Sequence, residues 1–369
     1  MLNTTLSHLS CPRRKKNRKC GGDLELTSEK KAIATTGAAT GGATGAATGA
    51  ATGAVTGAAT GAEIVSVFEV TTGELKCSMC GAKFPILGGV AVVVADVRDY
   101  LLSHVKGIAQ VVADSEIPRE YRREFLEAKA EIQLEHIEED LEAERVNALY
   151  LMNHYLRVSD LKPSAGKPWW KPEVGSSSVL MDKLIREYWD HGPFAQIGKW
   201  LAHLNLKSDL KSNLKSNLKS NLKSSAAGPK YDVLELGCGV GGLYLVLKPN
   251  ARSYLGVDSS FASIALARHL ILGVTGPQGA LRIPEDLLAG SVSRRIKLQQ
   301  GSFQGLAVNG QKADFIVGDL SNLPLRDGRY DLALALNAID MLDEPSDLPE
   351  LKYRLLRKDG ITVQSSPYI

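Results

Sequence analysis

The sequence is short of cysteine, of long apolar runs and of net charge. Its five cysteines are unevenly spaced, which excludes the disulfide framework of a small secreted domain. The longest apolar run, Ile86–Ala95, is far shorter than the roughly 20 residues of a membrane-spanning helix. A formal net charge of +3 does not by itself indicate nucleic-acid binding. The first residues reach a basic run before any apolar segment, so no signal peptide is recognised. These absences predict a soluble, cytoplasmic protein with no membrane contact.

The clearest chemical motif is the segment Tyr231–Gly242. Its sequence, YDVLELGCGVGG, predicts a short buried strand, a glycine-rich turn and then a helix. Glycine lets the backbone of the turn approach a ligand that lies across it. Two alternatives fit the spacing. Gly237, Gly239 and Gly242 match the G-x-G-x-x-G of dinucleotide sites, whereas taking Gly241 as the third glycine gives the G-x-G-x-G of S-adenosylmethionine (SAM) sites.

The segments that follow repeat a strand-and-turn pattern. Ser253–Ser259 predicts a second strand ending in Asp258, where a carboxylate can accept both hydroxyls of a ribose. Alternatively, this acid only caps the next predicted helix, Ala262–Leu272. Three further strands are predicted within Ala313–Pro324, Arg329–Asp340 and Leu355–Pro367. Strands that alternate with helices predict an α/β fold with a doubly wound, mostly parallel sheet, whose ligands bind beyond the carboxyl ends of the strands.

Taken in this order, Tyr231 to Ile369 resembles the class I SAM-dependent methyltransferases of the type 11 group. The motifs that carry the resemblance are LELGCGVG, GVDSS, GDLSNLP and the Tyr-Asp-Leu strand. The resemblance implies a Rossmann-like fold, SAM as cofactor and methyl transfer as the activity. It implies contacts to the methionine end, the ribose and the adenine of SAM. The implied SAM-binding residues are Glu235, Gly237, Cys238, Gly239, Gly241, Asp258, Ser259, Asp319, Leu320 and Asn337.

Asn337 and Asp340, at the end of the fourth predicted strand, are the candidates for catalysis. The resemblance places Asn337 beside the transferred methyl group, and Asp340 stands where many relatives carry histidine. A base is needed only if the acceptor must lose a proton, and we assign this role to Asp340. The sequence does not identify the acceptor, which is an RNA, a protein side chain or a small molecule.

Two alternatives to an active methyltransferase stay open. The sequence ends before the helix and antiparallel strand pair that the family usually adds, which leaves a catalytically silent, methyltransferase-like scaffold as an alternative. A nicotinamide-dependent oxidoreductase would share the glycine turn and Asp258. It would have no reason to carry the GDLSNLP segment or the Tyr-Asp-Leu strand.

Four cysteines near the start of the chain predict a zinc site. Cys77 and Cys80 form a C-x-x-C knuckle, whose turn directs two sulfurs and nearby amides towards one metal ion. Cys11 and Cys20 supply a second pair with looser spacing, so Cys11 is the weaker candidate. Four unrelated thiols are the alternative interpretation.

The sequence around these cysteines resembles the zinc-ribbon family whose members activate tRNA, rRNA and translation-factor methyltransferases. The matching segments are LSCP, CGGDLEL and LKCSMCGAKFPILGGV. The resemblance implies a structural zinc and a ribbon that serves the methyltransferase domain. The apolar segment Phe84–Val94 exceeds what so small a domain can bury, so part of it should face a partner. The basic run Arg13–Lys19 looks like an insertion into the first knuckle. It either contacts nucleic-acid phosphates or is a solvated tract.

These features divide the chain into four predicted parts. Residues 1–95 form a zinc-ribbon-like α+β domain, interrupted at 36–62 by a Thr-Gly-Ala repeat with nothing to bury. Residues 96–205 are helical, with a long amphipathic helix over Pro118–Tyr155. Tyr188–Pro193 is a candidate lid over the SAM site; the alternative is that Tyr188 and Trp189 are core aromatics and His191 lies on the surface. Residues 206–229 are a low-complexity linker, and residues 230–369 are the methyltransferase domain.

Overall fold

The computed structural model describes residues 1–15, 18–32, 69–135, 194, 196–200, 231–248, 250–272, 280–286, 291–297, 313–336, 338, 342 and 344–365. The Thr-Gly-Ala repeat, the 206–229 linker and the lid candidate Tyr188–Pro193 lie outside these ranges.

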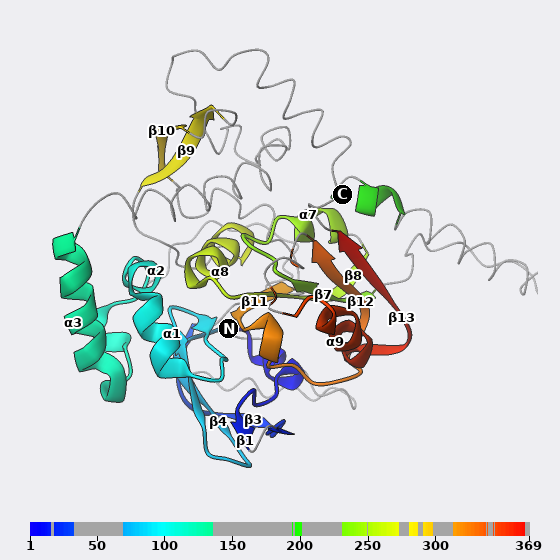
Figure 1. Ribbon diagram of the computed structural model, residues 1–369, viewed down its shortest axis with the longest axis horizontal. Coiled ribbons are helices and arrows are strands. Elements are labelled where there is room, and N and C mark those ends of the chain that lie inside the picture. Colours follow the sequence, from blue (N-terminus) through cyan, green and yellow to red (C-terminus); the bar gives the residue numbers. More distant parts are fainter. Residues whose placement is uncertain are drawn as a thin grey trace, which may run out of the picture.

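A five-stranded parallel sheet forms the centre of the molecule (Figure 1). Its order is β11-β8-β7-β12-β13, and each neighbouring pair is parallel. The strands are β7 (Tyr231–Leu236), β8 (Ala251–Asp258), β11 (Ala313–Val317), β12 (Tyr330–Leu336) and β13 (Leu356–Ser365). The inner strands are largely buried because both faces of a parallel sheet are covered.

Helices flank this sheet and follow its strands in alternation. They are α7 (Leu243–Leu247), α8 (Phe261–Ala267), its π-helical continuation η4 (Arg268–Leu272), the short 3-10 helix η5 (Leu320–Asn322) and α9 (Asp347–Leu355). Strand order reverses at β7, since β8 and β11 lie on one side of it and β12 and β13 on the other. The predicted doubly wound, Rossmann-like α/β fold is therefore confirmed.

The chain begins with a smaller antiparallel sheet. A 3-10 helix, η1 (Asn3–His8), precedes it. The sheet order is β3-β4-β5-β6, from β3 (Leu24–Ala32), β4 (Glu69–Cys77), β5 (Lys83–Leu87) and β6 (Val90–Ala91). Ala32 pairs with Glu69, so residues 33–68, which include the Thr-Gly-Ala repeat, join two adjacent strand ends.

The small sheet packs directly against the edge of the central sheet. Val92 forms a parallel bridge with Val317 of β11, and the Val93 amide donates to the Val317 carbonyl at 3.1 Å. Phe84 and Ile86 are fully buried in the same hydrophobic core that contains the central strands. The partner of the apolar segment Phe84–Val94 is thus β11 of the same chain.

The basic run forms a short hairpin that lies against the loop after β11. Its strands are β1 (Arg14–Lys15) and β2 (Arg18–Lys19). Lys19 donates from Nζ to the carbonyls of Leu323 and Leu325, and burial lowers the pKa of Lys19 to about 8. Arg14 Nη2 reaches the Ser321 carbonyl at 3.4 Å. Two of the basic side chains therefore bind backbone carbonyls of the protein itself.

A helical unit connects the small sheet to the face of the central sheet that carries α8. It comprises α1 (Val97–Ser103), α2 (Val105–Ala109), η2 (Asp114–Glu116) and α3 (Arg119–Glu135). Helix α3 is the first half of the helix predicted over Pro118–Tyr155, and the second half lies outside the described residues. An antiparallel pair, β9 (Ala280–Asp286) and β10 (Ser291–Lys297), was not predicted from the sequence. Within the described part of the chain, no helix is long and apolar enough to cross a membrane.

Candidate functional site

The glycine turn lies at the carboxyl end of β7. Gly237 has φ of +69°, and a Cβ there would come within 2.8 Å of Ala338 Cβ. Gly241 has φ of +75°, and a Cβ there would meet the Phe315 ring at 2.6 Å. The Gly237 amide donates to the Val257 carbonyl at 2.9 Å, which fixes the turn to β8. Glycine is therefore required at both positions by backbone conformation and by space.

Asp258, at the end of β8, is hydrogen-bonded to the glycine turn. Its Oδ2 accepts from the Gly239 amide and its Oδ1 from the Ser260 amide, both at 2.8 Å. Burial raises the pKa of Asp258, and these amide hydrogen bonds oppose the shift. An ionised carboxylate has roughly four acceptor positions, so capacity for a further donor remains beside these amides. The cap of α8 is Ser260, whose Oγ accepts from the Ser263 amide, so the alternative that Asp258 itself caps this helix is wrong.

Glu235 is the second carboxyl beside the turn. Its side chain is buried, and it accepts a hydrogen bond from Tyr254 Oη of the neighbouring strand. Burial, with a smaller contribution from the charge of Asp258, raises the pKa of Glu235 well above its usual range. Cys238, in the turn, is also buried, and burial raises the pKa of its thiol. Cys238 is therefore a neutral packing group in this arrangement.

The third segment of the expected SAM site follows β11. The Gly318 amide donates to the Asp258 carbonyl at 3.1 Å, which brings the segment beside the end of β8. Asp319 is exposed and caps η5 through its Oδ1, which accepts from the Ser321 amide at 2.8 Å, and Leu320 is buried. Ser259 is exposed at the tip of β8. The expected catalytic residues Asn337 and Asp340 lie outside the described residues.

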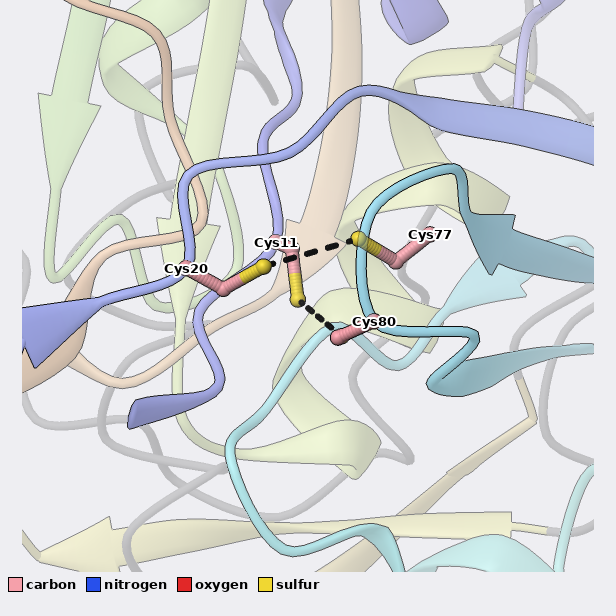
Figure 2. Close-up of side chains that lie close together, drawn as sticks. All are labelled: Cys11, Cys20, Cys77 and Cys80. Atoms are coloured by element: carbon pink, nitrogen blue, oxygen red, sulfur yellow. Dashed lines mark hydrogen bonds between the residues drawn. The ribbon is translucent and has the colours of Figure 1, made fainter. Parts of the chain in front are cut away.

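Four cysteines form a compact cluster in the N-terminal sheet (Figure 2). The Sγ atoms of Cys11, Cys20, Cys77 and Cys80 all lie within 4.8 Å of one another. The Cys11–Cys80 and Cys20–Cys77 sulfur distances are 3.6 and 3.7 Å. Tetrahedral Zn²⁺ with Zn–S of about 2.3 Å separates its sulfurs by about 3.8 Å, so the cluster has the dimensions of a zinc site. Cys11, the weaker candidate in the sequence, lies in the cluster with the other three.

The local backbone of the C-x-x-C knuckle favours a thiolate at Cys77. Although burial raises the pKa of Cys77, hydrogen bonds from the Cys80 and Met79 amides lower it overall. Burial and contacts with Cys80 and Cys77 raise the pKa of Cys11 despite an amide hydrogen bond at Arg13. A divalent cation at the centre would supply the positive charge that four clustered thiolates require.

Two tyrosines that contact residues of the expected SAM site are absent from the sequence-based prediction. Tyr254 holds Glu235, and Tyr100 Oη of α1 donates to the Ser259 carbonyl at 2.7 Å. Tyr254 lies two residues before Gly256, which pairs with Glu235, so strand register could have identified it. No local signal connects Tyr100 with Ser259, since they are 159 residues apart in the chain.

The central sheet and the glycine turn define a Rossmann-like domain, and comparison with known families adds a family match for part of it. Residues 234–363 match the family model described as a methyltransferase domain. The match covers β8 to β12, half of β7 and most of β13, and it excludes the small sheet and α1–α3. None of the curated proteins compared matches the chain.

Similar solved structures include three proteins of low sequence identity. YcgJ from Bacillus subtilis is 17% identical over 37% of this chain and 43% of that chain, with a TM-score of 0.26. The complex of the Haloferax volcanii Trm112 methyltransferase activator with a methyltransferase gives 19% identity, 38% and 47% coverage, and a TM-score of 0.26. Magnesium protoporphyrin IX methyltransferase (ChlM) from Synechocystis PCC 6803, with bound SAH, is 18% identical over 54% of this chain and 66% of that chain, with a TM-score of 0.28. The chain thus spans less than half of the first two proteins and less than two thirds of the third.

Proposed function

We propose that this protein is a SAM-dependent methyltransferase whose cofactor lies across the glycine turn and the ends of β7 and β8. The observation that carries the proposal is the position of Asp258. It is tied to the turn by the Gly239 amide and retains acceptor capacity at the tip of the second strand of a methyltransferase-type domain.

The residues beside the turn have the chemistry that SAM requires. Asp258 would accept the ribose hydroxyls, and Glu235 would face the cationic methionine end. Asp319 and Leu320 would lie against the adenine. Bound SAM supplies a methyl group already activated by its sulfonium, so the protein has to align the acceptor and exclude water. Asn337 would orient the acceptor, and Asp340 would take a proton where the acceptor must lose one.

We also propose a structural zinc ion at Cys11, Cys20, Cys77 and Cys80. Support comes from the sulfur spacing and from the amide hydrogen bonds that lower the pKa of Cys77. The ribbon would then serve the methyltransferase domain, and its contact with β11 supports this proposal. Arg14 and Lys19 make contacts within the protein, which leaves fewer cations of this run for the phosphates of an RNA acceptor.

The proposal predicts a specific loss of affinity in Asp258→Ala. Removing charge-assisted contacts to the ribose should weaken SAM binding by about 2 kcal/mol, or about thirtyfold. Isothermal titration calorimetry with SAM and with NADH measures this and separates a methyltransferase from a nicotinamide oxidoreductase. Asp327→Asn, which changes an exposed acid beside Arg354, is the matched control and should bind SAM like the parent.

Activity requires a second measurement. Transfer of tritiated methyl groups to fractionated RNA, protein and small molecules would identify the acceptor class. Tighter binding of NADH than of SAM would overturn the assignment. SAM binding without transfer to any fraction would favour the catalytically silent scaffold.

A further inference from the structure

Tyr100 reaches the nucleotide end of the sheet from outside the methyltransferase-type domain. It lies on α1, and its hydroxyl donates to the Ser259 carbonyl at 2.7 Å. The ring is buried and stacks on His104, with 4.0 Å between centroids. Burial, followed by the nearby charge of Asp258, raises the pKa of the Tyr100 phenol, so it stays a hydrogen-bond donor.

The peptide unit that accepts from Tyr100 also holds the Asp258 carboxylate. Its carbonyl belongs to Ser259, and its amide belongs to Ser260, which donates to Asp258 Oδ1 at 2.8 Å. A peptide unit is planar and trans, so fixing the direction of the C=O also fixes the opposite direction of the N–H. Tyr100 therefore determines where the amide that orients Asp258 points.

The same polar chain continues into the glycine turn. The second oxygen of Asp258 accepts from the Gly239 amide at 2.8 Å. One continuous set of hydrogen bonds thus connects Tyr100, the Ser259–Ser260 peptide, Asp258 and the turn. Rotation of the peptide would free Oδ1 and let the carboxylate turn away from a ribose.

Helix α1 is itself held firmly relative to this peptide. Before it, Val93 is hydrogen-bonded to Val317 of β11, and Asp96 caps the helix by accepting from the Asp99 amide at 3.0 Å. After it, α2 packs closely on α8, where a Cβ at Gly107 would come within 3.2 Å of Ala262 Cβ. The Tyr100 hydroxyl is therefore held in place by the packing of α1 and α2.

We propose that Tyr100 is a positioning residue for the SAM site, acting through the Ser259–Ser260 peptide to hold Asp258 in the orientation that accepts a ribose. The proposal rests on the proposed function, because it assumes that Asp258 binds the ribose of SAM. It adds to that function a positioning residue that precedes the family-matched segment 234–363.

The test is Tyr100→Phe, which removes the hydroxyl and retains the ring. Losing one buried hydrogen bond to the peptide should raise the Kd for SAM about threefold to tenfold. The KM for SAM should rise likewise, while the KM for the acceptor should not change. Tyr353→Phe is the matched control, since Tyr353 is 83% exposed on α9. It should bind SAM like the parent.

A double-mutant cycle separates positioning from a general loss of structure. If Tyr100 acts through Asp258, Tyr100→Phe should have no further effect on the Kd in an Asp258→Ala background. Equal Kd values for Tyr100→Phe and the parent, or the same fold-change in both backgrounds, would overturn the proposal. A parent that does not bind SAM at all would instead overturn the proposed function.

Discussion

Arg268 and Glu69 form a buried ion pair between the central domain and the small N-terminal sheet. Arg268 Nη2 lies 2.7 Å from Glu69 Oε1, and the Arg268 side chain is 1% exposed. Arg268 also contacts Asp314 of β11, which accepts from the Leu2 amide at 2.8 Å. Charges on β4, η4 and β11 therefore compensate one another inside the contact between the two sheets.

Glu69→Gln should destabilise the whole protein. The substitution leaves buried Arg268 with Asp314 as its counter-ion, so we expect a loss of about 2 kcal/mol in the free energy of unfolding, below the full cost of an unpaired buried charge. Urea unfolding measures it. Asp327→Asn breaks the exposed pair Asp327–Arg354 and should cost no more than about 0.5 kcal/mol. Similar losses of unfolding free energy in both variants would show that the buried pair contributes no more to stability than the exposed pair.

Zinc should be needed for the order of the small sheet. We expect one zinc ion per chain, and we expect Cys80→Ser to lower both the zinc content and the melting temperature. Elemental analysis with thermal melts measures this. Cys238→Ala is the matched control, because Cys238 lies outside the cluster and should leave the zinc content at one. Zinc-free parent protein, purified without chelator, would contradict the assignment.

SAM affinity should rise with pH. Burial raises the pKa values of Asp258 and Glu235, so each carboxyl stays protonated above its usual titration range in the free protein. For folding alone, a raised carboxyl pKa adds stability at low pH that is lost as the pH rises through the raised value. Binding has the opposite sign, because ribose hydroxyls and a cationic ligand favour the ionised carboxylates.

Calorimetry between about pH 5 and pH 8 checks this pH dependence. The increase in affinity should be smaller in Asp258→Asn and in Glu235→Gln, each of which lacks one of the two titrating groups. A parent affinity that does not vary with pH would contradict the argument.

Deleting residues 36–62 should change little. The repeat has no large side chains to bury, and the ends of its connection are held together by the Ala32–Glu69 pair. We expect the melting temperature and the SAM affinity to stay close to those of the parent. A large fall in melting temperature would show that the repeat packs against the rest of the protein.

Local patterns in the sequence were sufficient for the central sheet and for the cysteine cluster. Strands such as β7 and β8 are short runs with an apolar centre; glycine follows β7 and an acid ends β8. A C-x-x-C knuckle is recognisable from its spacing alone. The contact of Tyr100 with Ser259 and the pairing of Arg268 with Glu69 depend on how distant segments pack. Tyr100 and Arg268 belong to no recognisable motif, so the sequence does not distinguish them from the other tyrosines and arginines.

The bridge between Val92 and Val317 also has a consequence for folding during synthesis. The small sheet leaves the ribosome early, but β11, which covers its apolar edge, follows more than 200 residues later. At ordinary translation rates this interval is on the order of tens of seconds. During that time Val92 and Val93 lack their contact with β11, so chaperone demand should concentrate on the first half of the nascent chain.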